Sequence, residues 1–349
     1  MIATVRLLAA LGWCVAAWAA APVAQPHRAA PPASSGASAA AASSEDALSP
    51  LQAPAAFLAA LDGALRDGNQ AVARVREFDR AQQALAAWDE EQAIALRQAG
   101  DAALADERTR SARDRIAAVE EAYLRVLRRH PKNARALNYY GELLYDRLRR
   151  ESEGVQFWEK AAAADSRYAA PRNNLGIHYC HAGDYAKGFT NFDRALKLEP
   201  DNPDFLYNHA QVLLIHRSHA QRHYRCTLEQ VYVRAMEESK KAVAIQPDDF
   251  ELARDYAQNF FAAEQFGVEA DWRLALEAWA RARALAGSSA EEFLAWMYEA
   301  RAAIRLGDND HARHALRQAL ALKPDSAAAK ALMDRIGDPA ASLGSGETP

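Results

Sequence analysis

Two stretches of the chain decide the fold: ESEGVQFWEKAAAADS (151–166) and YAKGFTNFDRALKLEP (185–200). The second repeats the pattern of the first, with glycine, a large aromatic residue, alanine and a helix-ending residue at a constant separation of 34. The matched pairs are Gly154 with Gly188, Trp158 with Phe192, Ala161 with Ala195, and Ser166 with Pro200. Self-similarity at a fixed period of this length indicates an array of repeats.

The two stretches belong to a long segment whose pattern is helical. Between about residues 54 and 336, apolar residues recur at separations of three and four, and prolines are confined to junctions. No part of this segment shows the two-residue alternation typical of a strand. The sequence therefore predicts an all-α fold.

Residues 169–202 and 293–326 hold the fullest copies of the repeat. The first copy has Leu175, Gly176, Tyr179, Gly183, Asp184, Tyr185, Phe192, Ala195 and Pro200, and the second has Trp296, Ala300, Gly307, Asp308, Ala312, Ala319 and Pro324. This pattern resembles the tetratricopeptide repeat, a helix-turn-helix unit with small residues where its two helices cross. Poorer copies begin near 135, 203 and 250. The resemblance implies a right-handed α-solenoid over 112–336, with an N-terminal helical region (54–111) and a final capping helix (326–336).

Packing explains the residue types of the motif. One helix pair cannot bury its apolar face alone, so we expect stacked repeats to form the core. The residues expected at the helix crossings are Gly176, Ala210, Ala257 and Ala300, and those expected to fill the space between repeats are Trp158, Phe192 and Trp279. Capping boxes are predicted at Thr227 with Gln230 and at Ser289 with Glu292.

One departure from the repeat length lies between Pro200 and Pro247, which are 47 residues apart. The 13 additional residues predict an insertion at 214–227. Nothing between Ile215 and Tyr224 breaks a helix, so we expect the helix that starts near 203 to continue two turns past the solenoid edge.

Two further segments depart from the motif. Ala242 and Ala282 are 40 residues apart, and FGVEAD (266–271) is the predicted extra loop. Residues 54–130 lack the motif and are interrupted at Gly100 and Asp101. They form either a divergent pair of repeats or a long helical hairpin that caps the array.

The insertion carries a stripe of histidines, His216, His219 and His223, on one helix face with Cys226. Imidazoles at this spacing can share a zinc or copper ion, and His181 of the previous repeat lies beside the level of His216. A metal site of His181, His216, His219, His223 and Cys226 is therefore the alternative hypothesis. Arginines interleaved with the stripe would repel a cation, so we expect an exposed helical extension and no cofactor.

The N-terminus predicts export. A short start with one positive charge precedes the apolar run LLAALGWCVAAWAAA (7–21), and Ala17-Trp18-Ala19 is a small-x-small cleavage site, so residues 1–21 are predicted to be a signal peptide. An uncleaved membrane anchor is the alternative. The Ala/Pro/Ser-rich residues 22–53 are predicted to be a disordered linker, and 337–349 a disordered tail. We therefore expect a bacterial-type protein of the periplasm or cell envelope.

Removal of the signal would leave two cysteines, Cys180 and Cys226, which permits one disulfide. Cys226 lies 12 residues beyond the position that aligns with Cys180, about 18 Å along a helix. A disulfide would therefore require the insertion to fold back.

Charge and motifs exclude several functions. A formal net charge of −4 provides no excess of cations for phosphate contacts, so no nucleic-acid partner is expected. The chain lacks HExxH, a glycine-rich phosphate loop, G-x-S-x-G and CxxCH, so no enzyme is expected.

In the resembled family, the first helix of each repeat lines a concave groove that binds peptides or helices of partner proteins. Carried onto this chain, the groove residues are Asn138, Glu142, Asn173, Ile177, His181, Tyr207, Gln211, Arg254, Gln258, Arg301 and Arg305. These do not match the paired Lys/Asn clamp that some members use for a C-terminal carboxylate. The resemblance implies a non-enzymatic scaffold at the cell envelope, and it leaves the partner and the oligomeric state open.

Overall fold

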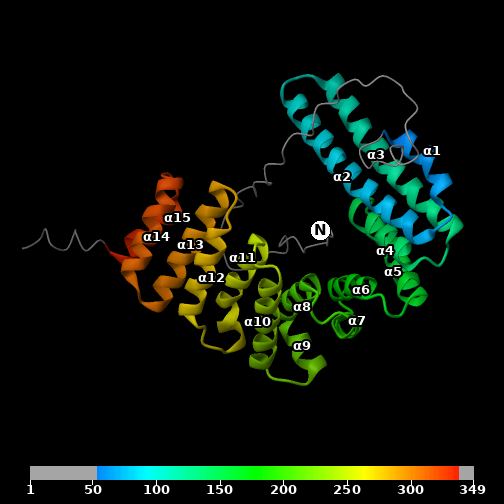
Figure 1. Cartoon of the computed structure of the whole chain (residues 1–349). Coiled ribbons are helices and arrows are strands. Elements are labelled where there is room, and N and C mark those ends of the chain that lie inside the picture. Colours follow the sequence, from blue (N-terminus) through cyan, green and yellow to red (C-terminus); the bar gives the residue numbers. More distant parts are fainter. Residues whose placement is uncertain (1–52, 338–349) are drawn as a thin grey trace, which may run out of the picture. The chain divides into compact units, whose positions relative to one another are not determined.

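A computed structural model describes residues 53–337, and within this range the chain is all-helical, with no strand (Figure 1). The expected fold class of helix-turn-helix repeats is confirmed. The predicted signal peptide, nearly all of the linker and all but the first residue of the tail lie outside the described residues. The described chain divides into an N-terminal unit (53–182 with 190–198) and a C-terminal unit (183–189 with 199–337).

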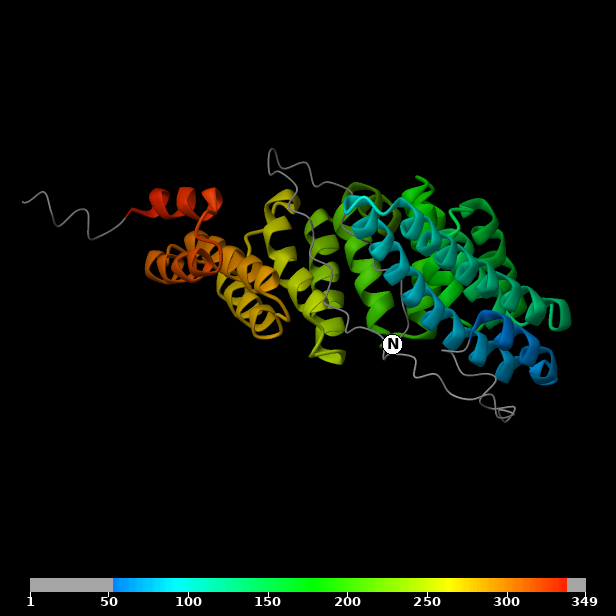
Figure 2. The same cartoon turned by 90° about the horizontal axis from the view of Figure 1, so that it is seen from above.

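The N-terminal unit begins with a long helical hairpin, one of the two alternatives for residues 54–130. Its helices are α1 Pro54–Ala64, α2 Gly68–Gln98, α3 Ala102–Arg129, α4 Ala134–Glu142, the π-helical turn η2 Leu143–Arg147, α5 Glu151–Ala164, α6 Ala170–His181 and the second part of α7 Tyr185–Leu198. Helices α2 and α3 lie side by side in both views (Figure 1; Figure 2). The chain turns between them at Gly100, whose φ of +87° favours glycine, and Asp101 caps α3. The expected boundary between the N-terminal helical region (54–111) and the repeats (112–336) therefore lies inside α3.

The core of this unit joins the hairpin to the first repeat. The rings of Phe57 on α1 and Phe78 on α2 stack with centroids 3.9 Å apart. Trp158 is buried against Gly141, where an added Cβ would lie 2.7 Å from the indole ring. At Gly176 an added Cβ would lie 2.9 Å from the ring of Phe192. The glycines therefore sit at helix crossings, as the motif predicts.

The C-terminal unit stacks three helix pairs and a final helix. Its elements are the first part of α7, then α8 Pro203–Ile215, α9 Arg217–Tyr224, α10 Leu228–Ile245, α11 Phe250–Asn259, the 3₁₀ helix η3 Phe260–Phe266, α12 Trp272–Ala284, α13 Ser289–Leu306, α14 Asn309–Leu322 and α15 Ala327–Ile336. The pairs are α8 with α10, α11 with α12, and α13 with α14, and α15 packs on α14. Ala210, Ala257 and Ala300 are fully buried, in agreement with their predicted place at crossings.

The capping predictions have different outcomes. Thr227 and Gln230 form the expected capping box at the start of α10. The second prediction is wrong by one residue: Ser288, not Ser289, has the extended backbone of an N-cap and accepts the N–H of Glu291. The Glu291 side chain in turn accepts the N–H of Gly287. Helix α13 therefore starts one residue earlier than expected.

The expectation of one continuous helix through the insertion is wrong. Helix α8 ends at Ile215, and His216, with φ −106° and ψ 36°, separates it from α9. Arg225 ends α9 in the left-handed conformation, with φ 52°. The break allows α9 to bury Ala220 and to pack on α8 and α10, which a straight extension into solvent could not do.

The second predicted loop is shorter than expected. Phe266 is buried at the end of η3, and Gly267, with φ +70°, ends this helix. The connection to α12 therefore consists of residues 267–271, with Asp271 as the N-cap of α12. Among residues 53–337, no helix is long and apolar enough to span a bilayer.

Candidate partner-binding surface

In the N-terminal unit, most of the predicted groove residues belong to the core. Asn138 and Asn173 have no exposed surface, and Ile177 is 5 % exposed. The Asn138 amide donates to Glu142 Oε1 at 2.8 Å, and the side chain of Glu142 is 14 % exposed. Asn138 and Asn173 therefore have no surface to offer a partner, and His181 is the exposed member of this group.

These residues surround a buried ion-pair network that the sequence analysis missed. Arg76 on α2 donates to Glu142 Oε2 at 2.7 Å and to Asp79 Oδ2 at 2.9 Å. The Tyr123 hydroxyl donates to the same Asp79 oxygen at 2.7 Å. Arg76 and Glu142 are 66 residues apart, so no local spacing could have paired them. The network ties the hairpin to the first repeat.

Asp146 lies on the π-helical turn that follows Glu142. Burial and then the nearby charge of Glu142 raise the pKa of its carboxyl, Arg149 and Arg76 oppose the rise, and the pKa is about 7. Burial also raises the pKa of Glu142, against the opposing effect of Arg76. The network therefore holds more carboxyl groups than the single buried arginine neutralises.

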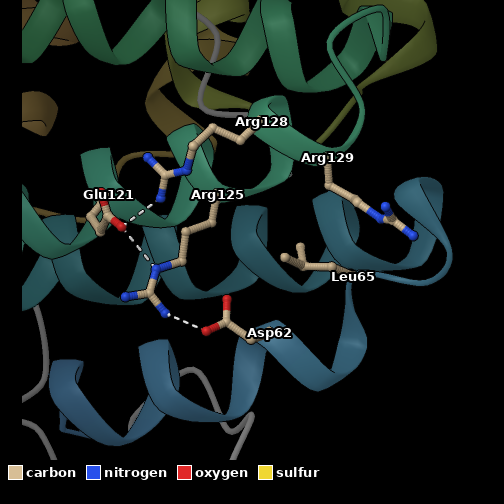
Figure 3. Close-up of a pocket in the computed structure, with 6 residues that line it drawn as sticks. All are labelled: Asp62, Leu65, Glu121, Arg125, Arg128 and Arg129. Carbon is tan, nitrogen blue, oxygen red and sulfur yellow. Dashed lines mark hydrogen bonds and ion pairs between the residues drawn. The ribbon is translucent and has the colours of Figure 1, made fainter.

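A group of arginines between α1 and α3 forms a shallow pocket (Figure 3). Arg125 donates to Glu121 at 2.8 Å, to Asp62 at 3.1 Å and to the Leu58 carbonyl at 2.6 Å. Arg128 donates to the same Glu121 oxygen at 2.7 Å. These hydrogen bonds lower the pKa of Glu121. The charges are largely compensated within the pocket, so we interpret it as the fastening between α1 and α3.

In the C-terminal unit, two predicted groove residues share a carboxylate that the sequence analysis missed. The Tyr207 hydroxyl on α8 donates to Asp255 Oδ2 at 2.7 Å, and Arg254 Nε donates to Asp255 Oδ1 at 2.7 Å. The hydrogen bond from Tyr207 brings the first helices of consecutive repeats together. Gln211 and Gln258 are partly buried on the same two helices.

Arg301 and Arg305 on α13 lie over aromatic rings. The Arg301 guanidinium is 5.1 Å from the ring centroid of Phe261 and 4.7 Å from that of Tyr298. Arg305 lies 4.8 Å from the ring of Trp272. Phe261 contacts both of the other rings edge-on, Trp272 with centroids 5.1 Å apart and Tyr298 with centroids 5.6 Å apart. We call Phe261, Trp272, Tyr298, Arg301 and Arg305 the arginine–aromatic surface.

The arginines of this surface are exposed and weakly neutralised. Arg305 lies 3.9 Å from Glu264, and the side chains of both are more than half exposed. Arg301 has no ion-pair partner among residues 53–337. The stacking holds both side chains in place without a strong carboxylate partner. The arginines were predicted as groove residues from the repeat pattern, whereas the rings were not, although Tyr298 lies one helical turn before Arg301.

The histidine stripe packs against aromatic rings. His219 stacks on Tyr185 with centroids 3.6 Å apart, and His216 lies 4.9 Å from the same ring. His223 lies 5.3 Å from the ring of Phe189. Arg222 donates to His219 Nδ1 at 2.9 Å, so this nitrogen is an acceptor. The stripe thus contacts the first part of α7 and is not the exposed extension that we expected.

Behind the stripe lies His209, a histidine that the sequence analysis did not name. It is fully buried on α8, with Nδ1 2.8 Å from Glu238 and Nε2 3.1 Å from the Tyr224 hydroxyl. Burial would raise the pKa of Glu238, but His209 and Arg234 outweigh it and lower the pKa. Arg234 also covers the ring of Tyr224 at 4.4 Å. These contacts anchor the end of α9.

Within the described range, no group of three or more His, Cys, Asp or Glu side chains is arranged to hold a metal ion. Cys180 is buried on α6, and Cys226 is partly exposed between α9 and α10.

Known proteins share this arrangement of helix pairs. Residues 293–326, which hold most of α13 and all of α14, match the family model of the tetratricopeptide repeat. The chain contains a tetratricopeptide repeat at these residues. The matched residues are those of the second full copy predicted from the sequence, so both the family and this register are confirmed. No curated protein matches the chain.

Solved tetratricopeptide repeat proteins are similar to the chain at low identity. YrrB, described as having an unusual peptide-binding site, is 18% identical with a TM-score of 0.47, covering 61% of this chain and 97% of its own. A protein from Cytophaga hutchinsonii is 16% identical with a TM-score of 0.47, covering 78% and 98%. PilF of Pseudomonas aeruginosa is 16% identical with a TM-score of 0.46, covering 73% and 99%. At these values the likenesses carry no information on function.

Proposed function

We propose that this tetratricopeptide repeat protein is a non-enzymatic scaffold that binds a peptide segment or helix of a partner protein. The binding surface is the groove face lined by the first helices α8, α11 and α13 of the C-terminal unit. Repeat arrays of this kind use their extended concave faces for binding, and the fold itself suggests protein–protein interaction.

The observation that carries the proposal is the arginine–aromatic surface. Arginine and aromatic side chains are enriched among the interface residues that contribute most of the binding energy. A guanidinium that is already stacked on a ring loses little conformational freedom when a partner binds. Arg301 and Arg305 are exposed one helical turn apart on α13. An acidic side chain of the partner can therefore pair with Arg301, while apolar groups beside it contact the rings of Phe261 and Trp272.

The remaining first-helix residues supply polar contacts. Arg254 and Gln258 on α11 are partly exposed, and Asp255 holds Arg254 in a fixed orientation. Gln211 on α8 is also partly exposed. Such groups suit hydrogen bonds to a peptide backbone, with the arginines as the charged anchor.

Affinity capture with charge-reversed variants tests this proposal. We expect a partner that is retained by the purified chain from an envelope extract to be lost with Arg301→Glu and weakened by Arg254→Glu. The matched control is Arg317→Glu, an exposed arginine on α14 that takes part in no described ion pair. Circular dichroism would verify that each variant is folded. A partner that all three variants retain equally would contradict the assignment of this face.

We also propose that the scaffold acts in the periplasm or cell envelope, on the basis of the apolar run at residues 7–21. The mass of the chain recovered from a periplasmic fraction tests this part. We expect a mature chain cut between Ala19 and Ala21, whereas an uncut chain in the cytosolic fraction would contradict export.

A further inference from the structure

A second groove lies in the C-terminal unit and shares no residue with the surface proposed above. It runs between α10, α11 and the connection that leads into α12. Its walls are Tyr232, Val233, Met236, Tyr256, Phe260 and Leu274, and its rim is Glu237, Lys240, Glu269, Ala270 and Asp271. None of these residues belongs to the arginine–aromatic surface.

The floor of the groove is formed by buried aromatic rings. Tyr232, Tyr256 and Phe260 are each less than a tenth exposed, and the rings of Tyr256 and Phe260 meet edge to face at 5.3 Å. Val233 stands beside them with 45 % of its surface exposed, one of the most exposed large apolar side chains of the described chain. A floor of buried rings next to an exposed valine is the arrangement of a pocket for an apolar side chain.

The rim is acidic. It holds three carboxylates and one ammonium group, so it carries a negative charge. Glu237 and Glu269 are exposed and have no ion-pair partner among residues 53–337. Asp271 caps α12 with one oxygen. Burial and then the charge of Asp271 raise the pKa of Tyr256. Two uncompensated carboxylates beside an apolar groove favour a cationic occupant.

We propose that this groove docks a basic amphipathic segment of a partner protein, which places leucine-sized side chains against Tyr256 and Val233. Lysine or arginine residues flanking that segment pair with Glu237 and Glu269. The groove shares no residue with the proposed face, and Tyr256 reaches it from α11, the helix that also carries Arg254 and Gln258. The scaffold therefore binds two partner segments of opposite character, an acidic one at Arg301 and a basic one here.

Two designed peptides test the proposal with the full chain. The probes are a dye-labelled leucine/lysine amphipathic peptide of about 14 residues and its leucine/glutamate counterpart. Fluorescence anisotropy at about 150 mM salt limits long-range attraction. We expect the leucine/lysine peptide to bind in the groove. The leucine/glutamate peptide carries the charge expected at Arg301, so the groove variants described next should not weaken its binding.

Two kinds of variant locate the binding. We expect Glu237→Lys with Glu269→Lys to weaken the leucine/lysine peptide by about tenfold or more. Val233→Asn, which removes exposed apolar surface without adding charge, should weaken it by about threefold or more. The matched control is Glu229→Lys with Asp325→Lys, which makes the same change of net charge at exposed positions outside the groove.

Three outcomes would overturn the proposal. One is that the control pair weakens binding of the leucine/lysine peptide as much as the groove pair does, because the peptide is then attracted only by the net negative charge of the chain. Another is binding of the leucine/lysine peptide that neither groove variant changes. The third is a dimer in sedimentation equilibrium that Val233→Asn dissociates, because a second copy is then the occupant.

Discussion

Gly154 shows how one residue sets the distance between two helices. A Cβ at this position would lie 2.8 Å from the carbonyl oxygen of Gly141 on α4 and 3.0 Å from Cβ of Tyr145. The first of these atoms belongs to the backbone and cannot rotate away. The crossing of α4 and α5 therefore requires glycine for its space, not for its conformation.

Replacing this glycine gives the first prediction. We expect Gly154→Ala to lower the free energy of unfolding by about 1–3 kcal/mol, because α4 and α5 must move apart. Urea unfolding followed by circular dichroism measures the change. Gly63→Ala is the matched control, since Gly63 lies in α1 with nothing within 4 Å of the added Cβ. That variant should gain about 0.5–1 kcal/mol from helix propensity, and an equal loss in both variants would refute the crossing argument.

Asp146 gives a prediction on pH. Its pKa is raised to about 7 in the folded chain, so between about pH 4 and 7 the folded state binds more protons than the unfolded state. Its contribution to stability is therefore favourable at low pH and is lost as the pH rises through 7. We expect Asp146→Asn to stabilise the protein at pH 8 by on the order of 1–2 kcal/mol and to make little difference at pH 4.

Unfolding curves of the two proteins at a series of pH values measure this difference directly. Subtracting one from the other cancels the titration of groups that both share. A difference that is constant from pH 4 to 8 would mean that Asp146 titrates normally.

At the scale of elements, α9 converts an inserted segment into packed structure. The insertion of 13 residues was evident from the spacing of Pro200 and Pro247. The bend at His216 could not be predicted from the sequence, because no proline or glycine lies there and all the residues around it are compatible with a helix. The bend is a tertiary effect: it places His219 on Tyr185 and His223 against Phe189.

The stack of His219 on Tyr185 predicts how firmly α9 is held. We expect His219→Ala to raise hydrogen exchange of the amides of α9, because an aromatic pair is worth about 0.5–1.5 kcal/mol, a factor of roughly 2 to 10 in local opening. His219→Phe is the control that keeps a ring. Exchange followed by mass spectrometry on peptides that cover 217–224 measures the effect, and identical exchange in the two variants would contradict the stack.

The same contact makes α9 sensitive to acid. Burial and then the charge of Arg222 lower the pKa of His219, so the folded state binds fewer protons than the unfolded state below about pH 6.5. The stabilisation is therefore complete above pH 6.5 and is lost as the pH falls below it. We expect exchange in α9, corrected for intrinsic rates, to rise between pH 7 and 5 in the wild type and to change less in His219→Phe.

At the scale of the whole chain, the repeat could be predicted because it is local. The period of 34, the glycines at crossings and the match at 293–326 all depend on residues close in sequence. The repeat pattern also predicts which residues of each first helix lie on its groove side. It does not predict whether those residues are exposed. Asn138 became core through Glu142 and Arg76, whose pairing spans 66 residues. Arg301 stayed exposed, and the rings beneath it come partly from another repeat.

The end of the array gives the last prediction. Helix α15 covers the final repeat with Leu332, Met333 and Ile336, which pack on a cluster around Trp296 and Leu316. A terminal repeat without its cap would expose this apolar surface to water. We expect a chain ended after Asp325 to bind a naphthalene-sulfonate dye more strongly and to unfold at a lower temperature in its C-terminal unit. A chain ended after Gly337, which keeps α15 and removes the residues beyond it, is the matched control. Equal dye binding by the two shortened chains would show that α15 is not the cap of the array.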